Sequence, residues 1–115
     1  MTISERVMGD VTVVDVAGRI TVQEGVDAFR DTLRRLVRDG HVRLVLNFRE
    51  VPYIDSTALG QLIRGYTSVT RKGGSLKLLE VQPKVHHLLV VTKLLSVFDL
   101  FDSEGEALKS FGAAR

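Results

Sequence analysis

One short segment of the chain combines helix-capping side chains with hydroxyls that could be chemically modified. Asp55, Ser56 and Thr57 are consecutive, and each is of a type that accepts a hydrogen bond at a helix N-terminus, where one such residue is enough. Ala58 and Gly60 are small, so the first turn of this helix would let another surface approach closely. The pattern is also compatible with a redundantly capped helix that makes a small-residue packing contact.

Other catalytic and metal-binding patterns are absent from the sequence. The chain has no cysteine, which excludes disulfides, thiolate metal sites and thiol nucleophiles. It also lacks the glycine-rich nucleotide-binding motifs and the G-x-S-x-G hydrolase motif. His86 and His87 are adjacent, so on a helix they point about 100° apart and cannot share one metal ion. We expect surface or boundary roles for these two and His41, and turn or capping roles for Asp99 and Asp102.

Length and charge restrict the class of protein. The 115 residues suit one domain. With 16 Lys and Arg against 14 Asp and Glu, the formal net charge is only +2, and 6% of residues are aromatic with no Trp. This composition is not typical of a nucleic-acid-binding protein. No apolar stretch approaches the about 20 residues of a membrane helix, and residues 1–10 do not look like a signal peptide. We expect a cytoplasmic binding module with no direct contact to nucleic acid or membrane.

Two groups of cations accompany the predicted helices and admit more than one interpretation. They could form a nucleic-acid patch or steer an acidic partner. We favour solvated helix faces, with cations near the C-terminal ends where the helix dipole stabilises them. The two groups are Arg34, Arg35 and Arg38 in the first helix, and Arg64, Arg71 and Lys72 along the second.

Runs of β-branched and aliphatic residues predict the strands. Residues 11–16 read as a buried strand, with residues 3–8 as its hairpin partner across Gly9-Asp10. Residues 42–48 give the strongest signal, a nearly continuous apolar run typical of a central strand. Further strands are expected at 76–81 and as a short segment within 94–101, with Arg19-Ile20-Thr21 as a short extra strand.

Apolar residues at helical spacing predict four helices between and after these strands. The first follows Val22 and ends at Gly40, a residue suited to a left-handed cap. The second begins near Asp55 and ends at Gly73-Gly74. The third begins at Pro83, and the last follows Asp102-Ser103. The expected inner residues are Val26, Phe29, Leu33, Leu36 and Val37; Leu59, Leu62, Ile63, Tyr66 and Val69; Val85, Leu88, Leu89 and Thr92; and Ala107, Leu108 and Phe111. This alternation predicts an α/β fold with a mixed or parallel sheet.

The sequence resembles the STAS domain family, and within it the bacterial anti-sigma factor antagonists. The specific part is the aspartate–serine pair followed by a small residue, leucine and glycine. The resemblance implies a single STAS domain over residues 1–115, with a mixed sheet of four to five strands and about four helices packed mainly on one face. The matching segments are 14–20 (VDVAGRI), 44–48 (LVLNF), 51–60 (VPYIDSTALG), 73–78 (GGSLKL) and 94–101.

The resemblance also implies a regulatory switch in place of an enzyme. In such proteins the serine that matches Ser56 is phosphorylated by a partner that is both anti-sigma factor and serine kinase. The unphosphorylated form binds that partner and releases the sigma factor, and a phosphatase resets the cycle. ATP belongs to the kinase, so no cofactor is expected. The implied partner-binding residues are Thr21, Asp55, Ser56, Thr57, Ala58 and Gly60.

Two departures from the family pattern are visible. Members often have glycine where this chain has Ala58, and alanine is the better helix former and adds only a methyl group. Antagonists that are phosphorylated often carry an aspartate after the second strand, where this chain offers Thr21. Fewer carboxylates near Ser56 would weaken recognition by a kinase or indicate a different partner.

Other functions remain open at this point. A STAS subunit could dock on the ATPase of a bacterial ABC transport complex, with no phosphorylation of Ser56. A small hydrolase using Ser56 would need a histidine within hydrogen-bond reach of the hydroxyl, and nothing in the sequence places His86 or His87 there. The chain is expected to be a monomer or a weak homodimer formed through the edge of its first strand.

Overall fold

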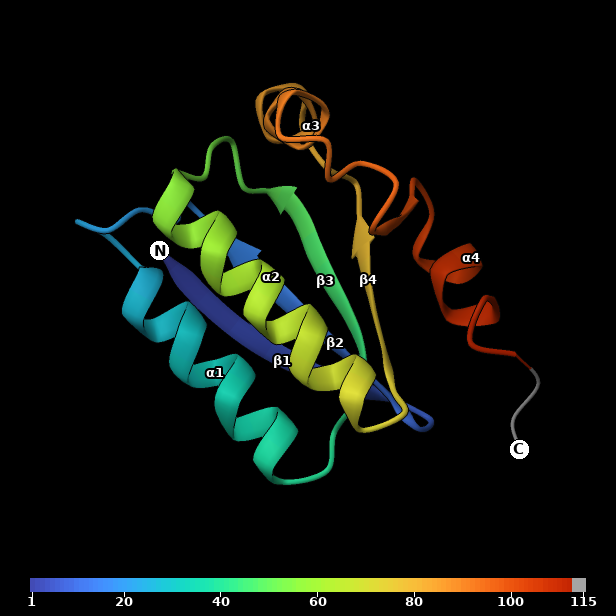
Figure 1. Cartoon of the computed structure of the whole chain (residues 1–115). Coiled ribbons are helices and arrows are strands. Elements are labelled where there is room, and N and C mark those ends of the chain that lie inside the picture. Colours follow the sequence, from blue (N-terminus) through green and yellow to red (C-terminus); the bar gives the residue numbers. More distant parts are fainter. Residues whose placement is uncertain (113–115) are drawn as a thin grey trace.

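The predicted strands form one five-stranded sheet in the computed structural model, which describes residues 1–112. The strands lie in chain order; β1 is antiparallel to β2, and the remaining neighbours are parallel (Figure 1). Gly9, with φ of 67°, turns the predicted hairpin between the first two. The strands are β1 (Thr2–Met8), β2 (Val11–Ala17), β3 (Arg43–Glu50), β4 (Ser75–Leu79) and β5 (Asp99–Phe101).

Four helices complete the fold in the described part of the chain. They are α1 (Val26–Arg38), α2 (Ser56–Arg71), α3 (Pro83–Val91) and α4 (Glu104–Lys109). The first three connect parallel strands that succeed one another in the same direction, and right-handed crossovers place such helices on one face. The fourth follows the last strand and packs Ala107 against the opposite face. The predicted α/β fold, with helices mainly on one face, is therefore confirmed. Within residues 1–112, none of the helices is long and apolar enough to span a bilayer.

The central strand is apolar on both faces because both are covered. Leu44, Val45 and Leu46 of β3 are each 0% exposed. Leu44 and Leu46 belong to the larger core beneath α1, α2 and α3, whereas Val45 belongs to a smaller cluster with Ala107 of α4. A parallel strand buried on both sides reads as an uninterrupted apolar run, as the sequence predicted.

Arg6 of β1 links β2 to α4 on that second face. Its guanidinium donates to Asp15 Oδ2 at 2.6 Å and to Glu104 Oε1 at 2.7 Å. Asp15 also accepts from the Asn47 amide at 2.8 Å. These contacts hold the pKa of the Asp15 and Glu104 carboxyl groups below their usual range, chiefly through the hydrogen bonds from Arg6.

Some local predictions need correction. The first helix does follow Val22 as predicted and begins at Val26, because residues 21–25 form a tight turn in which Thr21 N donates to Glu24 O at 2.7 Å. The extra strand expected at 19–21 is reduced to isolated bridges. Thr92 is exposed and ends α3, and its hydroxyl donates to Leu88 O at 2.6 Å instead of facing the core. Gly40, with φ of 86°, follows the end of α1 as predicted.

Candidate functional site

The start of α2 is fixed to the loop after β2. Ile20 and Ile54 form a parallel bridge, in which Ile20 N donates to Tyr53 O and Asp55 N donates to Ile20 O, both at 3.2 Å. The two isoleucine side chains are 0% and 2% exposed. The chain that leaves β3 is thus anchored immediately before the helix begins.

Asp55 is the N-cap of α2 and uses both carboxylate oxygens. Oδ1 accepts from Ala58 N at 2.8 Å, and Oδ2 accepts from Val22 N at 2.8 Å. The first bond satisfies a helix N–H that has no intrahelical partner, and the second joins the helix to the 21–25 turn. Asp55 therefore positions the helix end and supports the neighbouring Ser56.

Ser56 stands at the first position of α2 with an exposed side chain, and so does Thr57 at the second. Among residues 1–112, neither hydroxyl is in a hydrogen bond, because Asp55 alone provides the cap. The backbone N–H groups of Ser56 and Thr57 likewise have no acceptor in that part of the chain. Free N–H groups and the helix dipole favour an anion at this point. A phosphate on Ser56 would meet a local field that tolerates it.

Gly60 leaves open space one turn further along the helix. A Cβ built at Gly60 would meet no heavy atom within 4 Å. Residues four apart lie on the same face of a helix, so Gly60 continues the surface that Ser56 begins. The structure places Ser56, Thr57 and Gly60 together on one accessible strip.

Ala58 and Thr21 do not present their side chains to that strip. Ala58 is 1% exposed, because its place in the helical turn points it toward the core with Leu62 and Val69. Thr21 is 8% exposed, and its hydroxyl accepts from Glu24 N at 3.1 Å. Both side chains are therefore buried beside the strip, and a role of Thr21 and Ala58 in partner binding stays a prediction.

Apolar residues that the sequence analysis did not single out flank the serine. Val22 and Tyr53 are 64% and 42% exposed. Tyr53 also lines a depression of about 360 Å³ together with Pro83, His87 and Leu88 of α3. Exposed apolar side chains near a cleft are typical of protein-contact surfaces. From the sequence alone, an apolar valine and an aromatic tyrosine in short loops are expected to be buried. Only the exposure of Val22 and Tyr53 in the structure shows that they belong to the surface beside Ser56.

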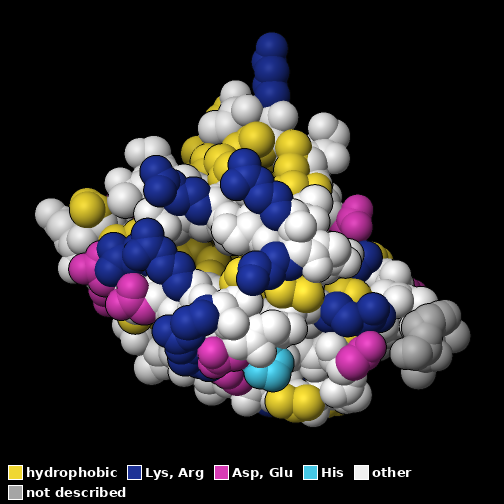
Figure 2. Space-filling model, turned by 60° about the horizontal axis from the view of Figure 1, so that its bottom comes forward, with side chains coloured by type: hydrophobic (Ala, Val, Ile, Leu, Met, Phe, Trp, Pro, Cys, Tyr) yellow, Lys and Arg dark blue, Asp and Glu magenta, His cyan; other side chains and the backbone are white. Residues whose placement is uncertain are grey.

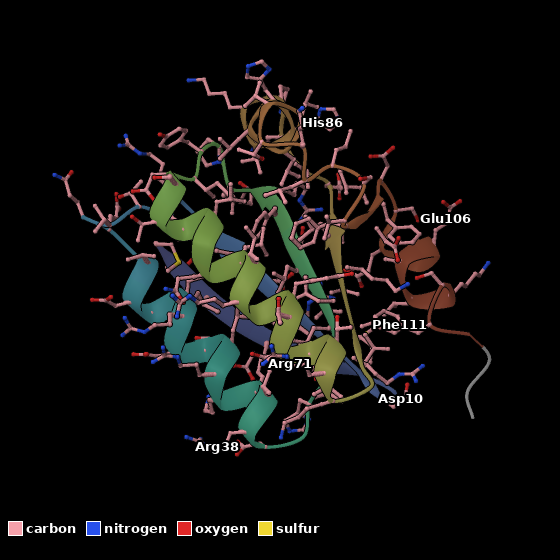
Figure 3. The ribbon with its side chains drawn as sticks, in the orientation of Figure 1. Asp10, Arg38, Arg71, His86, Glu106 and Phe111 are labelled. Atoms are coloured by element: carbon pink, nitrogen blue, oxygen red, sulfur yellow. The ribbon has the colours of Figure 1, made fainter. Side chains whose placement is uncertain are left out.

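The histidines give the hydrolase alternative no support. His86 and His87 are exposed on α3, and Figure 3 places His86 on that helix, away from α2. Within the described residues, no histidine nitrogen hydrogen-bonds the Ser56 hydroxyl. The Ser56 hydroxyl has no general base positioned for it there.

Comparison with known proteins identifies the family. The STAS domain model matches residues 2–107. The chain is 32% identical over 87 residues to the anti-sigma-B factor antagonist of Bacillus subtilis (strain 168). This match covers 76% of this chain and 78% of that protein. It is also 32% identical over 65 residues to the anti-sigma F factor antagonist of Paenibacillus polymyxa, where the match spans 56% of each chain.

Solved structures share the fold at lower sequence identity. A putative anti-sigma factor antagonist from Thermotoga maritima superposes with a TM-score of 0.88 at 21% identity, covering 94% of this chain and 92% of the other. The Bacillus cell fate determinant SpoIIAA in its phosphorylated form gives 0.77 at 17% identity, with 96% and 100% covered. A sulfate transporter family protein from Wolinella succinogenes gives 0.74 at 21%, with 91% and 87% covered. From the family model and the identity to the Bacillus subtilis relative, we conclude that this chain belongs to the STAS domain family.

Proposed function

We propose that this protein is an anti-sigma factor antagonist that regulates transcription by partner switching. It binds an anti-sigma factor while Ser56 is unphosphorylated. That anti-sigma factor is also a serine kinase, and its phosphorylation of Ser56 ends the complex until a phosphatase resets the cycle. The names of the two relatives that are 32% identical support the class of partner. Within this proposal the protein acts as one STAS domain over residues 1–115, in the cytoplasm, without a cofactor or a catalytic activity of its own.

The observation that carries the proposal is the Ser56 hydroxyl, which is exposed and makes no hydrogen bond within residues 1–112. A kinase could reach it without unfolding the chain. The free N–H groups at the helix start would accommodate the phosphate, since anions are stabilised at that position. Phosphorylation is therefore expected to change the surface while leaving the fold intact.

The effect on a partner follows from charge and desolvation. A phosphoserine adds about −1.5 to −2 charges beside the Asp55 carboxylate and one turn from the open strip at Gly60. A partner packed over this strip would have to remove water from that charge. Each loss of about 1.4 kcal/mol weakens binding tenfold, and leaving an uncompensated buried charge costs several kcal/mol. One phosphate could thus change the affinity by orders of magnitude.

Three variants test the proposal with the cognate anti-sigma kinase. Ser56→Ala should gain no phosphate by intact-mass measurement and should stay bound in a pull-down after ATP is added. Ser56→Asp should be captured poorly from the start. Thr70→Ala, the matched loss of an exposed hydroxyl at the other end of α2, should behave like the wild type. Equal capture of Ser56→Ala and Ser56→Asp would refute the phosphorylation switch.

The transport-complex alternative is not favoured. The relatives with 32% identity are named anti-sigma factor antagonists, whereas the transporter-family structure shares 21% identity and indicates the fold alone. A monomer or weak homodimer stays a prediction, with β1 at the edge of the sheet as the contact. β1 carries charged residues such as Glu5 and Arg6. Charged side chains on an edge strand limit its pairing with the edge of another sheet.

A further inference from the structure

A groove with an apolar floor and a basic rim runs between α1 and α2. Its volume is about 460 Å³. Figure 2 shows Lys and Arg side chains gathered around a hollow in which hydrophobic side chains are visible. The apolar residues that line the groove are Leu33, Val37, Ile63 and Gly65, and the arginines are Arg30, Arg34, Arg38, Arg64 and Arg71.

The groove gathers positive charge that the described residues only partly neutralise. None of the described residues that line it is Asp or Glu. Arg30 pairs with Asp27 and Asp31 of α1, and Arg38 pairs with Asp39 at 3.2 Å. Arg34, Arg64 and Arg71 have no carboxylate within 4.0 Å in residues 1–112. Arg34 and Arg38 of the first group of cations therefore meet Arg64 and Arg71 of the second group across one groove.

Helix dipoles do not account for this arrangement. Their effect is confined to the last turn of a helix. Arg38 and Arg71 lie in the last turns of α1 and α2, and Figure 3 labels both at the C-terminal ends of these neighbouring helices. Arg64 lies seven residues before the end of α2. Like charges around one hollow repel one another, so a bound anionic surface would stabilise them.

We propose that this groove binds an acidic amphipathic segment of another protein. Apolar side chains of the segment would lie on the Leu33 and Ile63 floor, and carboxylates would meet the arginines, whose planar guanidinium matches a carboxylate. The lining spans residues 30–38 and 61–71, which is about 12 and 15 Å along the helix axes at 1.5 Å per residue. That length suits two to three turns of a helix with apolar anchors about three and four residues apart. The apolar floor favours such a segment over a bare phosphate, and the hollow shape favours it over a flat lipid surface.

This inference does not rest on the phosphorylation switch. Ser56 is not among the residues that line the groove: it precedes the groove on α2, about 7 Å along the helix axis from Gln61 and about 22 Å from Arg71. Binding in the groove should therefore be the same in the wild type and in Ser56→Asp. If the switch fails and groove binding persists, or the reverse, the two proposals are separated.

The test is a selection of helical peptides on the whole protein. A display library with one randomised helix face is selected for binding to the wild type. It is then counter-selected against a groove variant that carries Arg34→Gln, Arg64→Gln and Arg71→Gln. The matched control carries Arg49→Gln, Lys93→Gln and Lys109→Gln, which removes the same number of positive charges elsewhere. Enriched peptides are then made in soluble form, and their affinities are measured at low and moderate salt. Vesicles of phosphatidylglycerol and inorganic polyphosphate serve as competing probes.

We expect enriched peptides that carry Asp or Glu beside an apolar stripe. They should bind the groove variant about tenfold or more weakly, equivalent to 1.4 kcal/mol or more, and the control variant like the wild type. Their affinity should fall with salt, because exposed charges are screened. Peptides without carboxylates, equal binding to the groove variant, or binding of only the vesicles or polyphosphate would each overturn the proposal.

Discussion

Replacing Asp55 should loosen the helix start that presents Ser56. The carboxylate accepts from Ala58 N and from Val22 N, both at 2.8 Å. Asp55→Ala removes both acceptors. Asp55→Asn keeps one acceptor oxygen and replaces the other by an amide donor, so it can satisfy only one of the two N–H groups.

The expected losses can be worked out from these two bonds. Removing an N-cap costs about 1 kcal/mol, and a hydrogen bond to a charged group contributes roughly 1.5–3 kcal/mol. The bond to Val22 N is exposed, so the lower value applies to it. Asp55→Ala should therefore lower the free energy of unfolding by about 2–3 kcal/mol, and Asp55→Asn by about 1 kcal/mol.

Urea unfolding monitored by circular dichroism measures these differences. The denaturation midpoint should fall in the order wild type, Asn, Ala, with an unchanged slope. Thr57→Ala is the control, because its exposed hydroxyl has no partner in residues 1–112, and surface changes of that kind stay within about 0.5 kcal/mol. An Asp55→Ala protein that is also within about 0.5 kcal/mol of the wild type would refute this account of the helix start.

Gly60→Ala should raise the free energy of unfolding by about 0.5–1 kcal/mol, since alanine is the better helix former and the added methyl meets nothing. The same methyl should weaken binding of the anti-sigma factor, and unchanged affinity would show that no partner packs there. Lowering the pH from about 7 to about 3 should destabilise the protein. The pKa of the Asp15 and Glu104 carboxyl groups is lowered by Arg6 in the folded state, so the unfolded state takes up more protons in that range. Glu104→Gln should flatten this dependence in pH-dependent unfolding, and identical slopes would contradict the role of Arg6.

Strand and helix order is predictable here because each element carries a strong local signal. The apolar run of β3 and the hairpin glycine at Gly9 leave few alternatives. The start of α2 is predictable as a region, since three consecutive residues can cap a helix. Which of them caps depends on Val22 N, which the chain brings to Asp55 only through the bridge between Ile20 and Ile54. The spacing of residues in the sequence cannot predict this contact between Val22 N and the Asp55 carboxylate.

The buried face of α2 shows the limit of periodicity. The apolar pattern predicts Ile63 and Tyr66 inside, yet both are half-buried, whereas Ala58 and Gly65 are buried. At Gly65 the neighbouring helix comes so close that a Cβ would lie 2.8 Å from Leu33 Cδ1. The small residue Gly65 lets α1 pack closely against α2 at this crossing. The face of α2 that is buried is therefore the one that carries Ala58 and Gly65. The same packing brings the arginines of two helices to one groove, which neither helix reveals alone.

The most direct test of the central claim is the affinity of the anti-sigma factor for the protein with and without a phosphate on Ser56. Both forms can be prepared, the phosphorylated one by incorporation of phosphoserine, and titrated by calorimetry. We predict that the phosphorylated form folds normally and binds about 100-fold or more weakly, a change of about 2.8 kcal/mol. Equal affinity of two folded forms would contradict the claim that the serine at the start of α2 controls partner choice.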